Sequence, residues 1–204
     1  MVANLKQSRC IIVPGLYDSG DSHWQTWIEQ CTPGAARISI EDWSVPNLGG
    51  WVDAISALVR ETPISNEVFL VAHSFGCLAA YAAARKLGGR VSGALFVAPS
   101  DPLNVALPDS VFASRLPFRS IVVASEDDPW MSLRRAREFA QTWNSAFVNA
   151  GFAGHINVAS GYGPWRDGLC LLQSLTAGED LPRDVMLGAP FTKSLCQESR
   201  LAGV

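Results

Sequence analysis

Short apolar runs and amphipathic segments alternate along most of this 204-residue chain. The apolar runs are rich in β-branched residues and are typical of strands buried on both faces of a parallel sheet. The segments between them carry apolar residues at helical spacing. This alternation predicts right-handed βαβ units and a single-domain α/β fold, with helices on both faces of a mostly parallel sheet.

The predicted elements follow one another in a regular order. Strands are expected at residues 9–13, 36–40, 68–72, 91–98 and 120–124, with a further strand from Ala146. Helices are expected from Ser22 and over residues 51–60, 76–87, 132–143 and 165–175. From residue 176 the chain turns to Gly, Pro and charged residues without sustained periodicity. We therefore expect one domain over residues 1–175 and a tail over residues 176–204, which is a candidate for a mobile segment.

One serine marks an abrupt change from strand to helix. Residues 68–72 form a predicted buried strand, and an alanine-rich helix is predicted three residues later. Ala72 and Gly76 stand two residues on either side of Ser74, and small residues at these positions allow the sharp turn of a nucleophile elbow. In such a turn the Phe75 N–H and the positive end of the helix face an oxyanion formed at the serine. The alternative is a serine that only caps a buried helix.

A nucleophilic serine needs a base and an acid that orients the base. The chain has three histidines, at positions 23, 73 and 155, and only His155 follows Ser74 with room for an acid between them. Glu126, Asp127 and Asp128 follow the predicted strand at residues 120–124. The order serine, acid, histidine is that of the α/β-hydrolases. A metal site at the three acids is disfavoured because no clustered histidine accompanies them.

Several short motifs resemble those of a known family. They are Pro14-Gly15, His23-Trp24 with Trp27, residues 72–76 (Ala-His-Ser-Phe-Gly), 125–129 (Ser-Glu-Asp-Asp-Pro), 154–157 (Gly-His-Ile-Asn) and 161–165 (Gly-Tyr-Gly-Pro-Trp). In this order, over roughly residues 9–175, they resemble the small serine hydrolases of the retinoblastoma-binding-protein-nine and YdeN type. The resemblance implies a compact single-domain α/β-hydrolase fold, a Ser–Asp–His triad and no cofactor.

The resemblance also assigns roles to individual residues. An acid followed three residues later by an apolar residue resembles the family pattern, and Met131 follows Asp128 in this way, which favours Asp128 over Asp127 as the triad acid. In the hydrolase fold the loop after the first strand gives the second oxyanion donor, which is Leu16 or, as the alternative, Tyr17. His23 is expected to hold this loop structurally rather than to take part in catalysis.

The connector after the fourth long strand suggests a small and open substrate site. Larger relatives insert a cap domain here, whereas residues 103–118 are enough only for a minimal lid. We expect Tyr17, Trp130 and Phe112 to contact the substrate, together with Phe75 beside the nucleophile. A shallow pocket of this kind predicts a preference for short acyl groups.

Composition narrows the class of protein and its partners. Hydrophobic residues make up 48% of the chain and charged residues 17%, which fits a sheet covered on both faces. A net charge of −3 lacks the basic footprint of a nucleic-acid-binding protein. No apolar run approaches the length of a membrane span or a signal peptide, so we expect a cytoplasmic protein without a membrane partner. Five cysteines without a C-x-x-C pair argue against a disulfide framework or a zinc site.

These patterns predict a serine hydrolase that cleaves a small ester or related acyl compound through an acyl-enzyme. The expected partner is a small-molecule acyl substrate, and the oligomeric state and the physiological substrate stay open. The alternative is a protein-interaction module built on a hydrolase fold with a vestigial triad, because a fold alone does not give activity.

Overall fold

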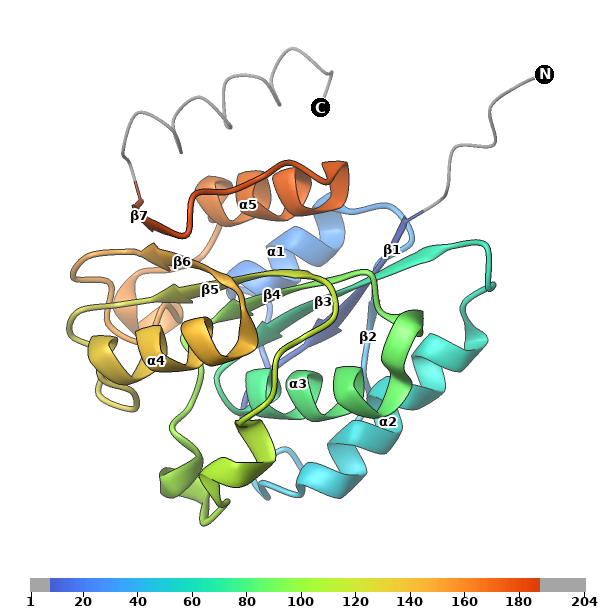
Figure 1. The fold of residues 1–204 in the computed structure, drawn as a ribbon, viewed down its shortest axis with the longest axis horizontal. Helices are drawn as coiled ribbons and strands as arrows, with labels where there is room; N and C mark the ends of the chain where they lie inside the picture. The colour runs from blue at the N-terminus through green and yellow to red at the C-terminus, as the bar shows by residue number, and fades with distance from the viewer. Residues whose placement is uncertain (1–7, 188–204) are drawn as a thin grey trace.

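The computed structural model describes residues 8–187, which form one parallel sheet covered by helices (Figure 1). The sheet order is β2-β1-β3-β4-β5-β6-β7, and all six strand pairs are parallel. The strands are β1 (Ser8–Val13), β2 (Ala36–Arg37), β3 (Glu67–His73), β4 (Gly93–Val97), β5 (Arg119–Ala124), β6 (Ala146–Asn149) and β7 (Asp184–Met186). The predicted α/β class is confirmed, although β2 is shorter than expected.

Within residues 8–187, five α-helices pack on the two faces of the sheet, and one apolar core lies on each side of it. The helices are α1 (Trp24–Cys31), α2 (Leu48–Glu61), α3 (Phe75–Leu87), α4 (Leu133–Trp143) and α5 (Arg166–Ala177). Helices α2, α3 and α4 cover one face and α1 and α5 cover the other (Figure 1). Alternate residues of each central strand point to opposite faces; for example, Ile11 belongs to the first core and Ile12 to the second.

The connector between β4 and β5 contains two short 3₁₀ turns, Pro102–Val105 and Asp109–Phe112. Arg135 on α4 holds this connector, because its guanidinium pairs with Asp101 at 3.2 Å and also with Asp109. The connector is therefore a small lid fixed to α4 rather than a separate domain.

Residue 175 was expected to end the domain. Helix α5 continues to Ala177, and the next segment returns to the sheet, where β7 pairs with β6. The rest of the predicted tail, residues 188–204, lies outside the described residues. Among the described residues, Cys10, Cys31 and Cys77 are free.

The strand order brings the loops after β1 and β3 together. Strand β1 lies between β2 and β3, so the chain leaves β1 toward one edge and later returns to its other side. Val13 at the end of β1 pairs with Ala72 near the end of β3. In open parallel sheets, ligands bind beyond the carboxyl ends of the strands at such a reversal of order. No helix among residues 8–187 is both long enough and apolar enough to span a bilayer.

Candidate active site

Ser74 lies in a strained turn between β3 and α3. Its φ of 53° and ψ of −126° lie in a region that residues with side chains rarely adopt. The turn closes because Gly76 has no side chain: a Cβ there would lie 2.2 Å from the Pro14 carbonyl oxygen. A Cβ on Gly15 would lie 2.8 Å from the Cβ of Ser74. The loop after β1 therefore packs directly against Ser74.

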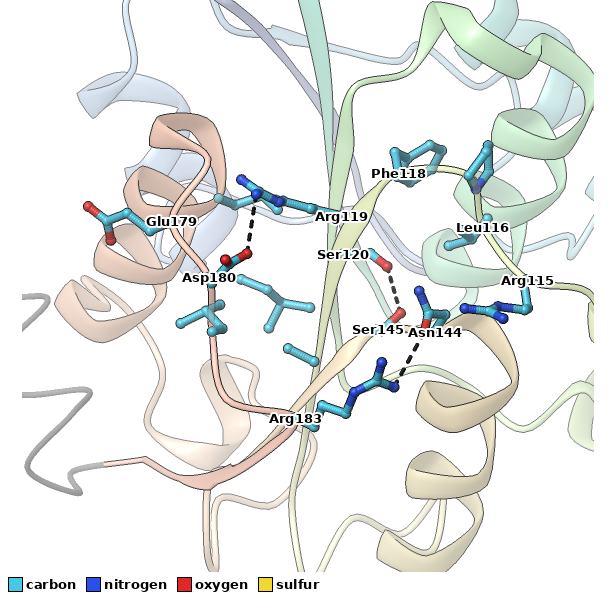
Figure 2. Close-up of a pocket in the computed structure, with 15 residues that line it drawn as sticks. Arg115, Leu116, Phe118, Arg119, Ser120, Asn144, Ser145, Glu179, Asp180 and Arg183 are labelled. Carbon is cyan, nitrogen blue, oxygen red and sulfur yellow. Dashed lines mark hydrogen bonds and ion pairs between the residues drawn. The ribbon is translucent and has the colours of Figure 1, made fainter.

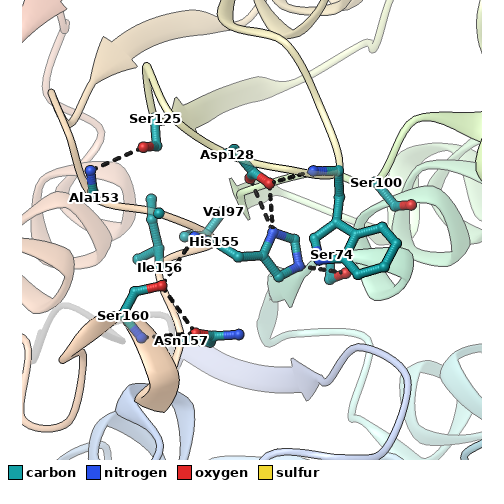
Figure 3. Close-up of polar contacts among 12 residues, drawn as sticks. Ser74, Val97, Ser100, Ser125, Asp128, Ala153, His155, Ile156, Asn157 and Ser160 are labelled. Carbon is teal, nitrogen blue, oxygen red and sulfur yellow. Dashed lines mark hydrogen bonds and ion pairs between the residues drawn. The ribbon is translucent and has the colours of Figure 1, made fainter.

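A continuous hydrogen-bonded chain joins Ser74, His155 and Asp128 (Figure 3). The Nε2 atom of His155 lies 2.9 Å from Ser74 Oγ. Its Nδ1 atom lies 2.9 Å and 3.0 Å from the two carboxylate oxygens of Asp128. Because an ionised carboxylate only accepts hydrogen bonds, Nδ1 carries the hydrogen and Nε2 is free to accept the serine proton. This is the tautomer that a general base needs.

The two neighbouring aspartates have different partners. The Asp128 side chain is nearly inaccessible, at 2% exposure, and one of its oxygens also accepts the Trp130 N–H at 2.9 Å. The Asp127 side chain turns away and accepts from Ser125 Oγ and from the Gly154 N–H, both at 2.7 Å. These hydrogen bonds lower the pKa of Asp127. Asp128 thus contacts the imidazole, and Asp127 supports the loop that carries it.

Two buried aromatic side chains hold the loop of His155 by donating hydrogen bonds to two consecutive carbonyl oxygens of that loop. The His155 carbonyl oxygen accepts from His73 Nε2 at 2.9 Å, and the next one, of Ile156, accepts from Trp24 Nε1 at 2.8 Å. On the other side, Ser160 Oγ accepts the His155 N–H at 3.1 Å. The imidazole position is therefore set by donors from the end of β3 and the start of α1.

Two backbone N–H groups are available to an oxyanion near Ser74. Phe75 is the first residue of α3, so its N–H has no acceptor within the helix. Among the described residues, the Leu16 N–H makes no backbone hydrogen bond, whereas the Tyr17 N–H donates to the Trp43 carbonyl oxygen at 2.9 Å. This difference favours Leu16 over Tyr17 as the second donor. Trp51 packs edge-on against the Phe75 ring, with 4.8 Å between ring centroids.

Polar contacts also fix the loop after β1. The guanidinium of Arg37 pairs with Asp18 at 2.9 Å and with Glu29 at 2.7 Å. The buried Gln25 side chain donates to the carbonyl oxygens of Val13, at 3.2 Å, and Val71, at 3.0 Å, and so ties the ends of β1 and β3 together. The loop is therefore held from both sides.

His23 caps α1, since its Nδ1 accepts the Gln25 N–H at 3.2 Å. Burial and then the positive charge of Arg37 lower the pKa of His23 to about 4. Its ring lies 5.0 Å from that of His73 and is not bonded to the Ser74 hydroxyl within the described structure. This geometry agrees with a structural role.

A cavity of about 520 Å³ opens above Ser74 and His155. Tyr17 and Trp130 lie on its rim with 78% and 54% of their surfaces exposed, and the lid contributes Asn104 and Val105.

Phe112 does not line this cavity, contrary to expectation. It is fully buried, with its ring 5.6 Å from that of Tyr81 and 6.5 Å from that of Phe139. The second 3₁₀ turn of the lid points this side chain down onto α3 and α4, where it joins the core. We therefore no longer assign Phe112 to substrate binding.

Other chemistry at this site is limited. Burial raises the pKa of the Cys77 thiol well above its ordinary value, and its Sγ lies 3.4 Å from the Val97 carbonyl oxygen, so this thiol is not a competing nucleophile. Within residues 8–187, no group of three or more His, Cys, Asp or Glu side chains is arranged to hold a metal ion.

Comparison with known proteins agrees with this geometry. Residues 10–174 match the model of a family described as serine hydrolase. The chain belongs to the serine hydrolase family. The resemblance to YdeN-type hydrolases is confirmed, and this serine hydrolase is an enzyme.

Solved structures support the same assignment. A YdeN-like hydrolase from Pectobacterium atrosepticum is 38% identical, with a TM-score of 0.80 over 84% of this chain and 91% of that chain. The ydeN gene product of B. subtilis is 22% identical, with a TM-score of 0.70 over 84% and 100% of the two chains. Est1E from Butyrivibrio proteoclasticus, solved with bound ferulic acid, is 12% identical, with a TM-score of 0.64 over 84% and 90%. The last two likenesses show the shared fold. No curated protein matches this serine hydrolase.

The sequence patterns do not identify the residues that hold the loop of His155 in this serine hydrolase. His73 and Trp24 lie in motifs that give them no role, and no pattern in the sequence marks Gln25. A signal was present for His73, since a histidine directly before the elbow serine ends a buried strand and needs a hydrogen-bond partner. Nothing in the sequence indicates that this partner is the His155 carbonyl.

Proposed function

We propose that this serine hydrolase cleaves small, uncharged esters or related acyl compounds through a triad of Ser74, His155 and Asp128. Ser74 Oγ attacks the acyl carbonyl carbon while His155 Nε2 takes the hydroxyl proton. The Phe75 and Leu16 N–H groups stabilise the oxyanion of the tetrahedral intermediate. When the bond to the leaving group breaks, His155 delivers the proton to that group and an acyl-enzyme remains.

The second half of the proposed cycle uses the same groups in reverse. Water replaces the leaving group, gives a proton to His155 and attacks the acyl-enzyme carbonyl carbon. Collapse of the second intermediate releases the carboxylic acid and returns the proton to Ser74 Oγ. Asp128 stabilises the imidazolium at both stages and stays ionised. The observation that carries the proposal is the hydrogen-bonded chain from Ser74 through His155 to Asp128.

The lining of the cavity supports an uncharged substrate. Among the described residues around it there is no lysine or arginine, and the one aspartate, Asp18, is already paired with Arg37. A carboxylate or phosphate on the substrate would have no cation to pair with and would lie near this acid. Apolar contact comes instead from Leu16, Val105 and Trp130.

A fluorophosphonate probe tests the proposal directly, because it reacts with an activated serine and not with an ordinary one. We expect the wild-type protein to be labelled once, at Ser74, and the Ser74→Ala variant to remain unlabelled. The alternative of an interaction module with a vestigial triad predicts no labelling of the folded wild-type protein. Hydrolysis of p-nitrophenyl acetate by the labelled and unlabelled samples gives the matching activity measurement.

A further inference from the structure

A second cavity, of about 630 Å³, lies at the amino ends of the strands (Figure 2). It is formed where β5 and β6 begin and where the chain leaves α5, whereas the triad lies beyond the carboxyl ends of the strands. None of its lining residues lines the cavity above Ser74. The proposed triad mechanism therefore does not involve this second cavity.

Two buried hydroxyl groups belong to residues that line this cavity. Ser120 Oγ and Ser145 Oγ are 2.6 Å apart and only 4% and 6% of these residues is exposed. One hydroxyl donates its hydrogen to the other. The hydroxyl that accepts still has its own hydrogen, which is free to be donated to another acceptor. Neither hydroxyl has another hydrogen-bond partner within residues 8–187. The pair can thus donate one hydrogen bond into the cavity.

Three arginines surround the serine pair (Figure 2). Arg119 is already engaged, since it pairs with Asp180 at 3.2 Å and donates to the Gly178 carbonyl oxygen. Among the described residues, Arg183 donates only to the neutral amide oxygen of Asn144, at 3.4 Å. Within the described part of the chain, Arg115 takes part in hydrogen bonding through its carbonyl oxygen and not its guanidinium.

The nearby helix C-termini explain the position of only one of these three arginines. Helices α4 and α5 both end beside the cavity, and a cation near a helix C-terminus is stabilised by the helix dipole. Arg119 meets this description, because it donates to a carbonyl oxygen just beyond α5. Arg183 contacts a side-chain amide instead, and the Glu179 carboxylate points away from the serine pair (Figure 2). Within residues 8–187, the guanidinium groups of Arg115 and Arg183 therefore have no carboxylate partner, although the formal net charge of the protein is −3.

We propose that this cavity binds a small organic oxyanion, a carboxylate or a phosphate monoester with an apolar body. Arg115 and Arg183 pair with the oxyanion, the fork geometry of guanidinium suits both headgroups, and the serine pair donates a further hydrogen bond. Leu116, Ile121 and Leu175 form apolar wall for the body of the ligand. This site is separate from the proposed hydrolytic function and does not depend on the triad.

The test is to titrate the full chain with benzoate, phenyl phosphate and neutral benzamide in turn. The readout is the change in the backbone amide NMR chemical shifts. We expect at least one of the two anions to shift the signals of Ser120, Asn144 and Ser145, and benzamide to leave them unchanged. Arg115→Gln and Arg183→Gln should each weaken anion binding about tenfold, since a hydrogen bond to a charged group contributes about 1.4 kcal/mol or more. The matched control is Arg134→Gln, because Arg134 lies on the exposed face of α4 and pairs with Glu138.

Arg115 is exposed, so its replacement does not disturb the core, and the melting temperature of each variant checks the fold. The proposal is overturned if both anions shift only signals near Ser74 or if benzamide binds the second cavity as well as benzoate does. Equal binding by the Arg115→Gln variant and the Arg134→Gln control would overturn it too. A failure of fluorophosphonate labelling would affect only the proposed hydrolytic function, because the readout here is independent of catalysis.

Discussion

The Nε2 atom of His73 lies 2.9 Å from the carbonyl oxygen of His155, the residue whose imidazole contacts Ser74. A carbonyl oxygen can only accept, so His73 Nε2 carries the hydrogen. Burial, reinforced by the neighbouring histidines, lowers the pKa of His73 well below its ordinary value. The ring is therefore neutral at pH 7, with its one hydrogen on the nitrogen that holds the catalytic loop.

This contact predicts that His73 is a positioning residue. His73→Phe keeps a ring but removes the donor, and we expect kcat to fall about tenfold to a hundredfold with little change in KM, because small displacements of a base are costly. His73→Gln carries an amide donor near the position of Nε2 and should recover most of the loss. Steady-state kinetics with p-nitrophenyl acetate measures both. Equal activity of the Phe variant and the wild type would show that the contact has no role in catalysis.

A second prediction concerns the nucleophile and the base. Ser74→Ala and His155→Ala should each lower kcat by about a thousandfold or more, and the double variant should be hardly worse, because triad members act as a unit. Circular dichroism should show that the fold is intact. The assignment of Ser74 would be wrong if Ser74→Ala retained more than about a tenth of the wild-type turnover.

The third prediction separates the two aspartates. Asp128→Asn should reduce kcat by about three to four orders of magnitude, because the amide favours the wrong tautomer of His155. Asp127→Asn should cost less than about tenfold, since it weakens only the bonds from Ser125 and the Gly154 N–H and leaves the imidazole contact in place. A greater loss for Asp127→Asn than for Asp128→Asn would reverse the assignment.

A fourth prediction concerns acyl length. Each methylene that enters the apolar part of the site gains about 0.8 kcal/mol, which is about fourfold in kcat/KM. The gain should stop after the first few carbons, because the cavity of about 520 Å³ is shared between the acyl and leaving groups and the lid is short. A series of p-nitrophenyl esters from acetate to palmitate measures the trend. A maximum at decanoate or longer would contradict a shallow pocket.

The fifth prediction is a pH dependence of stability. The pKa of His23 is lowered from 6.5 to about 4 in the folded protein, so the unfolded chain binds more protons between these values. The free energy of unfolding should therefore decrease as the pH falls from about 6.5 to about 4, by up to about 3 kcal/mol from His23. His73 contributes in the same direction.

The matched variant for this effect is His23→Asn, because asparagine can still cap α1 but does not titrate. Urea unfolding at several pH values should show a smaller slope for this variant than for the wild type, with part of the slope left from His73. An unchanged slope would mean that His23 does not carry the effect.

The residues of the proposed triad could be picked out from the sequence because few other residues fit each role. Only one histidine follows Ser74 after an acid, and the change of period at residue 74 marks the elbow. The direction of Phe112 could not be predicted, because the lid has no repeating period to show which side faces the core. Strand β7 was missed because three residues joined by backbone hydrogen bonds leave almost no pattern in side-chain polarity.

Gly15 and Gly76 are closely packed at the turn that carries Ser74, so this part of the site tolerates mutation less well than the rim of the cavity does. A methyl group at either position would meet atoms within 3 Å, so even alanine would displace the turn that carries the nucleophile. Tyr17 and Trp130 stand on the exposed rim, where there is space for other side chains, although the φ of 66° at Tyr17 does not suit β-branched residues. Directed evolution of this enzyme toward new substrates therefore has its freedom in the rim, while the elbow accepts almost no change.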